Sequence, residues 1–537
     1  MLPQIASISP SVTAWVLSTD HTVRRHRWRE WGVVTAPMRR EVVTSLRWSA
    51  VALIAVRAVS TIRGVLLARL LGPGPFGVFF AVAAVANMVL LGAEFGLGPF
   101  VIHGAQGARS RADVAATWAV ATGLIGAALV AASARVTAGP YGPTAEPIAL
   151  LLSGSVLLAP LSGVCLSLLR VELRFRRLAL LQLVAEVTAT ISALVLAFWL
   201  KHPGAWPLVT SVLVGRAVTV GVAIVAVGRL HPRPSLLRAP MARDLLKFGL
   251  PICVGAMAWA VALQGDNVVV GRVLGATAVG IYGLAYNYGD LPSALLGNIV
   301  GQVAFPVFTH ARDDAAELAA EFFRFTRLVA LLVCPIVATA TVVADLAVNL
   351  LLGHSWLAAV TPLRIFLIGG ALRGLFPTLE LLRAVGRVGV ELRIGLVAAP
   401  AVLVAAYLGT RHGVPLVSVL VAIVFAGAVV ANVSVAARAT GVSALRVWLA
   451  PARVVSVSVI GSIALRALAQ TLGLGDFAVI AFTGLGTAGL VLGAACAGLV
   501  PGWQDVRAIV ARGSIESIDP ELAADWPPTE DSMPLEP

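Results

Sequence analysis

The sequence predicts an all-α integral membrane protein with about fourteen transmembrane helices, and three observations support this class. Charged residues make up 12% of the 537 residues, about half the usual share in a soluble domain. Hydrophobic residues make up 58%, and the mean hydropathy is +0.91. The apolar residues come in long blocks, which a soluble core of this size could not bury. The composition therefore excludes a set of soluble domains.

The apolar blocks are each about 18–25 residues long, which is enough to cross a hydrocarbon core of about 30 Å. Short connections separate them, so no loop is long enough to hold a soluble catalytic domain. The expected helices are centred near Val56, Ala86, Gly123, Leu158, Thr190, Leu213, Ala256, Asp290, Leu332, Ala371, Pro400, Ile423, Val459 and Leu490.

This order of blocks predicts five regions along the chain. A disordered, Arg-rich cytosolic extension over 1–40 precedes a first six-helix lobe at 41–230 and a second six-helix lobe at 231–440. An extra pair of helices follows at 441–502. The tail at 503–537 is acidic and carries too little apolar surface to fold, so we expect it to be disordered in the cytosol.

The net charge of +13 could suggest a nucleic-acid partner, but the positions of the charges argue against one. Most arginines lie in short clusters between apolar blocks, as topology signals do, and no basic helix with interleaved aromatic residues is present. With both termini in the cytosol, most of the 40 Lys and Arg residues fall on the cytosolic side of a plasma (inner) membrane. The opposite side carries Arg69, Arg135, Lys201, Arg272, Arg411 and Arg466.

Cysteines and enzyme motifs give no sign of chemistry. Cys165, Cys253, Cys334 and Cys496 lie far apart inside apolar blocks, which predicts small core residues rather than disulfides or metal ligands. The sequence contains no GxxxxGK[ST] or HExxH motif in a plausible context. We therefore expect no metal, no cofactor, no catalytic residue and no enzymatic activity.

An internal repeat is the most informative pattern. The segment RLLGPGPFGVFFAV at 69–82 matches RVLGATAVGIYGLA at 272–285, which pairs Gly72 with Gly275 and Gly77 with Gly280. A second match relates LLRVELR at 168–174 to LLRAVGR at 381–387. Six predicted helices separate equivalent points, which indicates two pseudo-symmetric lobes followed by an extra helix pair.

Three segments resemble the polysaccharide-transporter branch of the multidrug/oligosaccharidyl-lipid/polysaccharide exporter superfamily: residues 68–102, 247–287 and 305–314. The resemblance covers roughly residues 42–440 and does not include the Arg-rich N-terminus or the acidic tail. It implies an O-antigen-type flippase that moves an undecaprenyl-pyrophosphate-linked oligosaccharide across the inner membrane by alternating access. It also implies membrane lipids as partners, with a polysaccharide polymerase and glycosyltransferases as candidate partners, and we expect a monomer.

Ionisable residues at bilayer depth are candidates for function because they are costly unless they face protein or water. Near the predicted midplane lie Arg57, Glu186, Arg216, Asp290 and Arg373. Guanidinium groups match phosphate oxygens well, so we predict that Arg57, Arg216 and Arg373 line a central cavity and bind the lipid pyrophosphate. The alternative is structural pairing, for example of Arg57 or Arg216 with Glu186.

Five further positions are candidates for gating or ion coupling: Arg63, Asp266, Asp290, Glu94 and Glu380. The repeat aligns Arg63 with Asp266, which predicts an ion pair between them that latches an outer gate. The alternative is that Arg63 extends to the membrane interface. Arg373 and Glu380 are seven residues apart, which would place them on one helix face.

Other functions make different demands. A cation-coupled multidrug exporter would favour acidic residues in the cavity. A lipid II flippase is hard to distinguish from an oligosaccharide flippase by sequence. A membrane glycosyltransferase or polymerase needs acidic residues on a substantial outer loop. The predicted outer loops carry little besides Glu146, Asp345 and Asp476.

Overall fold

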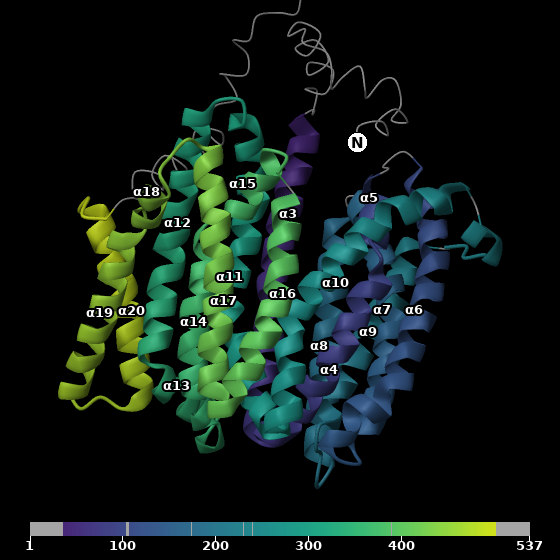
Figure 1. The fold of residues 1–537 in the computed structure, drawn as a ribbon, viewed down its shortest axis with the longest axis horizontal. Helices are drawn as coiled ribbons and strands as arrows, with labels where there is room; N and C mark the ends of the chain where they lie inside the picture. The colour runs from purple at the N-terminus through teal and green to yellow at the C-terminus, as the bar shows by residue number, and fades with distance from the viewer. Residues whose placement is uncertain are drawn as a thin grey trace, which may run out of the picture.

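The protein, seen in a computed structural model, is a bundle of long helices that run roughly side by side (Figure 1). The structure describes residues 36–103, 107–172, 174–228, 230–238, 240–387 and 389–500. Every regular element in these ranges is helical, so the predicted all-α class is confirmed. The predicted tail at 503–537 and nearly all of the predicted extension at 1–40 lie outside the described residues.

The first half of the chain forms seven α-helices and two short 3-10 turns. These are α3 (Ala36–Leu71), α4 (Pro73–Glu94), α5 (Leu97–His103), α6 (Ala108–Ala138), η1 (Gly139–Tyr141), α7 (Ala145–Val171), α8 (Phe175–Trp199), α9 (Trp206–Val227) and η2 (Pro234–Arg238).

The second half continues with another series of helices. These are α10 (Pro240–Leu274), α11 (Ala276–Ala311), α12 (Ala315–Val342), α13 (Ala344–Leu351), η3 (His354–Ala359), α14 (Val360–Leu375), α15 (Thr378–Ala384), α16 (Gly389–Gly409), η4 (Thr410–His412) and α17 (Val414–Ala439). The chain then forms α18 (Ala444–Leu449), α19 (Ala452–Thr471) and α20 (Asp476–Cys496).

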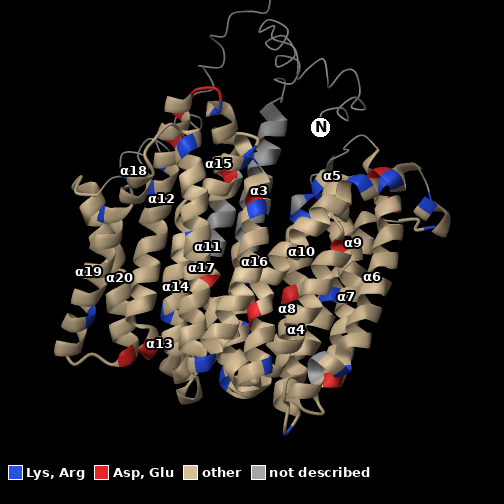
Figure 2. Ribbon diagram, in the orientation of Figure 1, with Lys and Arg blue, Asp and Glu red and all other residues tan. Residues whose placement is uncertain are grey.

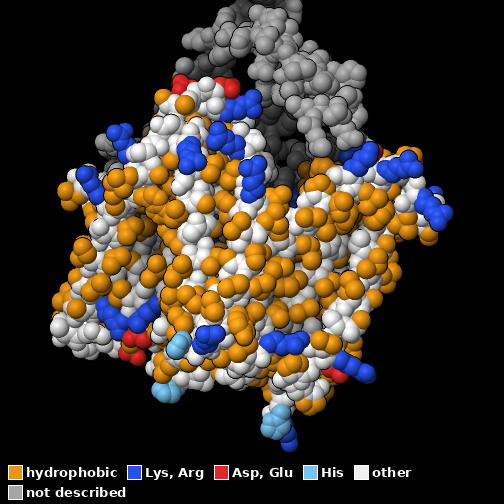
Figure 3. Space-filling model, viewed as in Figure 1, with side chains coloured by type: hydrophobic (Ala, Val, Ile, Leu, Met, Phe, Trp, Pro, Cys, Tyr) orange, Lys and Arg blue, Asp and Glu red, His pale blue; other side chains and the backbone are white. Residues whose placement is uncertain are grey.

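The face of the bundle seen in Figure 3 is apolar over its middle. Trp199 and Val225 are each 82% exposed, an exposure that only a lipid environment makes favourable for such large side chains. Lys and Arg gather mainly toward the ends of the helices (Figure 2). The protein is therefore a multi-pass membrane protein.

Within the described residues, twelve helical segments are long and apolar enough to cross a membrane. Helices α3 and α11 are not among the twelve, although each has 36 residues and runs along the bundle. They correspond to the predicted first and eighth spans. The count of fourteen therefore stays a prediction.

The repeat found in the sequence forms a reciprocal junction between α4 and α11. Gly72 and Gly275 precede these helices with φ of 74° and 86°, a left-handed region that favours glycine. A Cβ on Gly77 would overlap the Ala276 carbonyl, and a Cβ on Gly280 would overlap the Pro73 carbonyl. Each half thus presents the same surface to the other, as in a two-fold interface. We call this end of the bundle the joined end.

Two arginines from the repeat add a second reciprocal contact at the joined end. Arg69 of α3 donates a hydrogen bond of 2.9 Å to the carbonyl of Leu350 in the second half. Its repeat partner Arg272 of α10 donates one of 2.8 Å to the carbonyl of Val136 in the first half. Both acceptors lie near the C-terminal end of a helix, where carbonyl oxygens lack intrahelical partners.

Trp356 contacts both halves of the chain next to this junction. Its ring is fully buried, and its Nε1 donates a hydrogen bond of 2.9 Å to the carbonyl of Ala68 at the end of α3. Phe76 packs edge-on against the ring with centroids 5.5 Å apart. The end of α3 is therefore held to η3 by both a polar and an aromatic contact.

The last helix pair is attached by ion pairs. Arg466 of α19 binds both carboxylate oxygens of Asp345, at 2.9 and 2.7 Å, and Arg364 binds the same carboxylate at 3.0 Å. Burial raises the pKa of Asp345, but the hydrogen bonds from Arg466 and the charge of Arg364 outweigh it and hold the pKa below its ordinary value of 3.8. Asp345 stays ionised at neutral pH and joins α13, α14 and α19.

Candidate functional site

Two adjoining cavities lie between the halves of the chain. The larger, of about 350 Å³, is bounded by α4, α7, α9, α10 and α11. The smaller, of about 230 Å³, is bounded by α3, α4, α9 and α11. Both cavities are lined by Phe79, Phe80, Val212 and Asn287, so they adjoin each other. Their total volume is in the usual range for a ligand site.

The smaller cavity is lined by Arg57 and Arg63, and we call it the arginine compartment. Helix α3 supplies Arg57, Ser60, Thr61 and Gly64, a spacing that places them on one helix face. Gly64 leaves room for Tyr288 of α11, whose hydroxyl a Cβ at this position would overlap. The compartment is therefore built where α3 and α11 approach each other closely.

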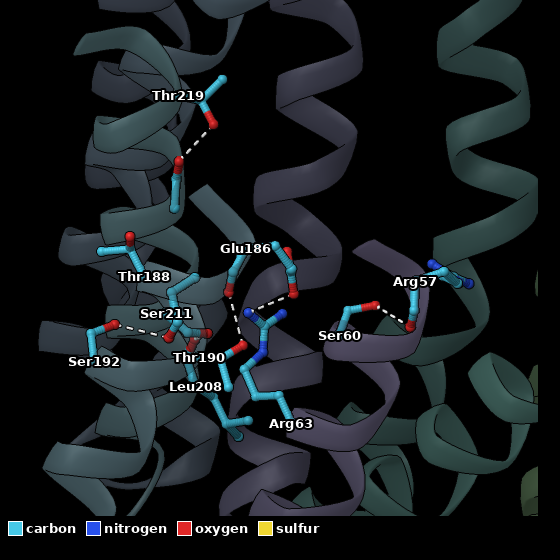
Figure 4. Close-up of polar contacts among 12 residues, drawn as sticks. Arg57, Ser60, Arg63, Glu186, Thr188, Thr190, Ser192, Leu208, Ser211 and Thr219 are labelled. Atoms are coloured by element: carbon cyan, nitrogen blue, oxygen red, sulfur yellow. Dashed lines mark hydrogen bonds and ion pairs between the residues drawn. The ribbon is translucent and has the colours of Figure 1, made fainter. Parts of the chain in front are cut away.

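Arg63 and Arg57 differ in their partners, as Figure 4 shows. Arg63 forms an ion pair of 2.9 Å with Glu186 of α8, and each side chain is 19% exposed. The side chain of Arg57 points away from Glu186 and makes no hydrogen bond or ion pair with the described residues. One positive charge is therefore neutralised by the protein, and the other remains available to a ligand.

The larger cavity is lined by the amides of Asn87, Gln264, Asn267 and Asn287, and we call it the amide compartment. Arg216 of α9 also lines it. Among the described residues, the lining of the two compartments includes three arginines and no Asp or Glu. The two adjoining compartments are therefore suited to a ligand with an anionic group and many polar groups.

Of the three arginines predicted to bind substrate, Arg57 and Arg216 line the compartments and Arg373 does not. Arg373 donates to Asp290 at 2.7 Å and to the Tyr286 hydroxyl at 3.2 Å. Its guanidinium also lies 4.6 Å from the centre of the Phe425 ring. The second half therefore holds Arg373 in an internal network, which reaches the cavity only through Tyr286.

The predicted pair between Arg63 and Asp266 is wrong for this structure. Arg63 pairs with Glu186 because α3 packs against α8. The alternative interpretation had paired the same acid, Glu186, with Arg57 or Arg216. Asp266 is fully buried in the second half and accepts a hydrogen bond of 2.6 Å from Tyr282.

Glu94 and Glu380 do not line either compartment. Glu94 is the last residue of α4, just before a break at Phe95, and lies within electrostatic range of Arg216. The prediction that Arg373 and Glu380 share a helix face is wrong, because α14 ends before Pro377 and Glu380 lies on the separate α15.

The four amides are functional candidates that the charged residues do not reveal. Asn87, Gln264, Asn267 and Asn287 lie inside apolar blocks, where a polar side chain tends to face protein or a cavity rather than lipid. Their occurrence within predicted spans was the available signal. No cluster of three or more His, Cys, Asp or Glu side chains suited to a metal ion occurs among the described residues.

Comparison with known proteins shows the family to which this chain belongs. Residues 66–361 match the family model described as polysaccharide biosynthesis protein. The lipopolysaccharide biosynthesis protein WzxC of Escherichia coli (strain K12) is 23% identical over 399 residues, which are 72% of this chain and 80% of that protein. The succinoglycan biosynthesis transport protein ExoT of Rhizobium meliloti (strain 1021) is 25% identical over 323 residues, which are 59% of this chain and 64% of that protein.

Among solved structures, the lipid II flippase MurJ in an inward closed conformation has a similar fold. The TM-score is 0.69 at 11% identity, with 84% of this chain and 99% of that chain covered. At this identity the likeness concerns the fold alone. The family match spans more than half of the sequence and includes α4, α11 and most of the cavity lining. The chain belongs to the polysaccharide biosynthesis protein family.

Proposed function

We propose that this protein flips an undecaprenyl-pyrophosphate-linked oligosaccharide across the bacterial inner membrane by alternating access. The observation that carries the proposal is the pair of adjoining cavities between the two halves, whose lining among the described residues includes three arginines and four amides and no Asp or Glu. A lipid-linked oligosaccharide combines the two chemistries that such a lining fits, an anionic pyrophosphate and a hydroxylated glycan. WzxC and ExoT, which are named for polysaccharide biosynthesis and transport, support the proposal.

In this proposal the arginine compartment binds the pyrophosphate. Arg57 lies within electrostatic range of Glu186 but forms no ion pair with the described residues, so it can offer its guanidinium to the phosphate oxygens, while Arg63 is held in place by Glu186. Arg216 binds from the amide compartment. Arg373 acts on the substrate only indirectly, by positioning Tyr286. The candidates for ion coupling or gating remain Asp266, Asp290, Glu94 and Glu380.

We infer that the joined end faces outward, because the Arg-rich clusters of the sequence fall at the opposite end. The state described here is then closed to the outside. Flipping requires that the lobes at 41–230 and 231–440 separate at the joined end and close at the other, while the acyl chain stays in lipid. The protein acts as a monomer, beside the polymerase and the glycosyltransferases that make and use its substrate.

A cation-coupled drug exporter fits the site less well. Binding of an organic cation favours carboxylates in the cavity, but no described Asp or Glu lines it, and Glu186 nearby is already paired with Arg63. A lipid II flippase remains the nearest alternative, because lipid II has the same pyrophosphate and differs in the glycan.

The deciding experiment is deletion of the gene, followed by analysis of lipid-linked glycans and surface polysaccharide. We expect a complete lipid-linked unit to accumulate in the inner leaflet while surface polysaccharide falls, and the intact chain to restore both. The composition of the accumulated glycan separates an oligosaccharide unit from lipid II. Normal surface polysaccharide with altered drug sensitivity would contradict the proposal, and truncated lipid-linked sugars would indicate a glycosyltransferase instead.

A further inference from the structure

The four amides of the amide compartment come from both halves of the chain and surround one space. Asn87 lies on α4, Gln264 and Asn267 lie on α10, and Asn287 lies on α11. The aromatic rings of Phe80 and Tyr286 lie among them. Amides on facing helices around aromatic rings form a lining that offers both hydrogen bonds and flat apolar surfaces.

Asn267 gives the strongest evidence for a ligand among the four amides. It is 6% exposed, and its Oδ1 accepts no hydrogen bond from the described residues although it lines the compartment. The donor side of the same residue is occupied, because its backbone N–H and its Nδ2 lie 2.8 and 3.4 Å from the Asp266 carboxylate. Tyr282 holds that carboxylate at 2.6 Å. The amide is thus fixed with its acceptor oxygen left for another group.

Asn287 is also oriented by a bond within the protein. Its Nδ2 donates a hydrogen bond of 2.7 Å to the carbonyl of Gly283 on its own helix, and the residue lines both compartments. Asn267 and Asn287 are therefore two oriented amides in the lining of one compartment. Acceptor oxygens repel a phosphate and attract hydroxyl or amide N–H groups.

The two compartments consequently differ in chemistry. The arginine compartment supplies donors and positive charge, whereas Asn267 and Asn287 supply acceptors. Because the compartments adjoin at Asn287, one ligand can occupy both if a hydroxylated group is attached directly to an anionic one. A sugar linked to a pyrophosphate has this arrangement.

We propose that the amide compartment is the saccharide-recognition site, in which Asn267 and Asn287 accept hydrogen bonds from hydroxyl or N-acyl groups of the sugar attached to the pyrophosphate. This inference rests on the proposed function and deepens it. Asp266 and Tyr282 are positioning residues, since they fix the Asn267 amide without lining the compartment. The glycan specificity of the protein resides in these amides and not in the arginines.

The test measures binding of two probes to the purified full-length protein in nanodiscs. One probe is the lipid-linked oligosaccharide that accumulates in the deletion strain, and the other is undecaprenyl pyrophosphate without sugar. We expect Asn267→Ala to weaken binding of the first probe about tenfold and to leave binding of the second unchanged. Arg57→Ala is expected to weaken both. Asn287→Ala gives an independent second variant, on another helix, in case Asn267→Ala fails to fold.

Asn432 provides the matched control. Its Oδ1 also lacks a hydrogen bond from the described residues, but it lies on α17 and lines neither compartment. Asn432→Ala should leave both affinities unchanged. The proposal is overturned if Asn267→Ala and Asn287→Ala weaken both probes equally or weaken neither. If the unsubstituted protein binds neither probe, the proposed function itself fails; if it binds both with equal affinity, only the saccharide site fails.

Discussion

The reciprocal contacts of Arg69 and Arg272 predict how firmly the joined end is closed. We expect Arg69→Ala combined with Arg272→Ala to favour opening at this end, because each substitution removes a hydrogen bond of 2.8–2.9 Å between the halves. Both bonds are exposed, so each contributes about 0.5–1.5 kcal/mol. Together they amount to about 1–3 kcal/mol, which shifts the equilibrium toward the opened state by about 5- to 150-fold.

The assay is labelling of a cysteine placed at Ser211, a buried residue that lines the arginine compartment. A membrane-impermeant maleimide is added from outside to a chain whose four native cysteines are replaced by alanine. The double variant should label about 5- to 150-fold faster than its parent. Arg135→Ala is the matched control, since Arg135 lies near the joined end but pairs with Glu146 within the first half. Equal labelling in parent and double variant, or an equal rise in the control, would refute the reasoning.

Three further predictions concern the junction and the stability of the fold. Gly77→Ala should sharply reduce surface polysaccharide in cells, because the added methyl group overlaps the Ala276 carbonyl. Gly427→Ala, a site with open space around it, should not, and equal effects of the two substitutions would contradict the junction. Asp345 has a folded-state pKa below its unfolded value of 3.8, so its stabilising effect is present above that value and is lost as pH falls through the folded pKa. Asp345→Asn should therefore flatten the fall in thermal midpoint of the detergent-solubilised protein between about pH 5 and pH 3, and an unchanged profile would argue against these ion pairs. Trp356→Phe removes a single hydrogen bond and should cost about 0.5–1.5 kcal/mol, whereas Trp356→Ala should cost about 3–5 kcal/mol in the same measurement; similar midpoints for both would exclude the packing role.

The sequence repeat coincides with the junction because its glycines answer local physical demands. Gly72 and Gly275 are required by backbone conformation, and Gly77 and Gly280 by the close approach of two helices. Such demands leave the same residue at equivalent positions in both halves. The symmetry of the fold is therefore visible without a structure.

The partners of individual charges were harder to predict. The repeat aligned Arg63 with Asp266, but equivalence under a pseudo-two-fold axis does not make two residues neighbours. Arg63 meets Glu186 because α3 packs against α8, which depends on the packing of whole helices and not on local spacing. Depth in the membrane pointed to a cavity at Arg57 and Arg216, which do line the two compartments, and their part in substrate binding stays a prediction.

Two other differences have local causes. The spacing of Arg373 and Glu380 suggested one helix face, but Pro377 interrupts the helix between them, a signal that the sequence carries. Asn267 was overlooked because neutral amides do not register in an analysis of charge. Its importance appears only when its Nδ2 is seen to donate to Asp266, while its buried Oδ1 has no hydrogen-bond partner among the described residues and the residue lines the compartment.

The central claim is that the two halves move against each other to carry the lipid-linked glycan, and a reversible cross-link at the joined end tests it most directly. A Cβ at Gly74 lies 3.9 Å from the Thr277 Oγ1 across the junction, close enough for Gly74→Cys and Thr277→Cys to form a disulfide. The control pair, Gly369→Cys with Ala422→Cys, joins α14 to α17 inside the second half, where the two Cβ atoms are 3.7 Å apart.

The measurement is flipping of the accumulated lipid-linked oligosaccharide in liposomes. Flipping is monitored by how much of the glycan becomes protected from a membrane-impermeant oxidant that is added after the cysteine pair has been oxidised or reduced. Oxidation of the pair at positions 74 and 277 should stop flipping, and reduction should restore it, while the control pair flips in both states. Continued flipping with the junction cross-linked would contradict the account.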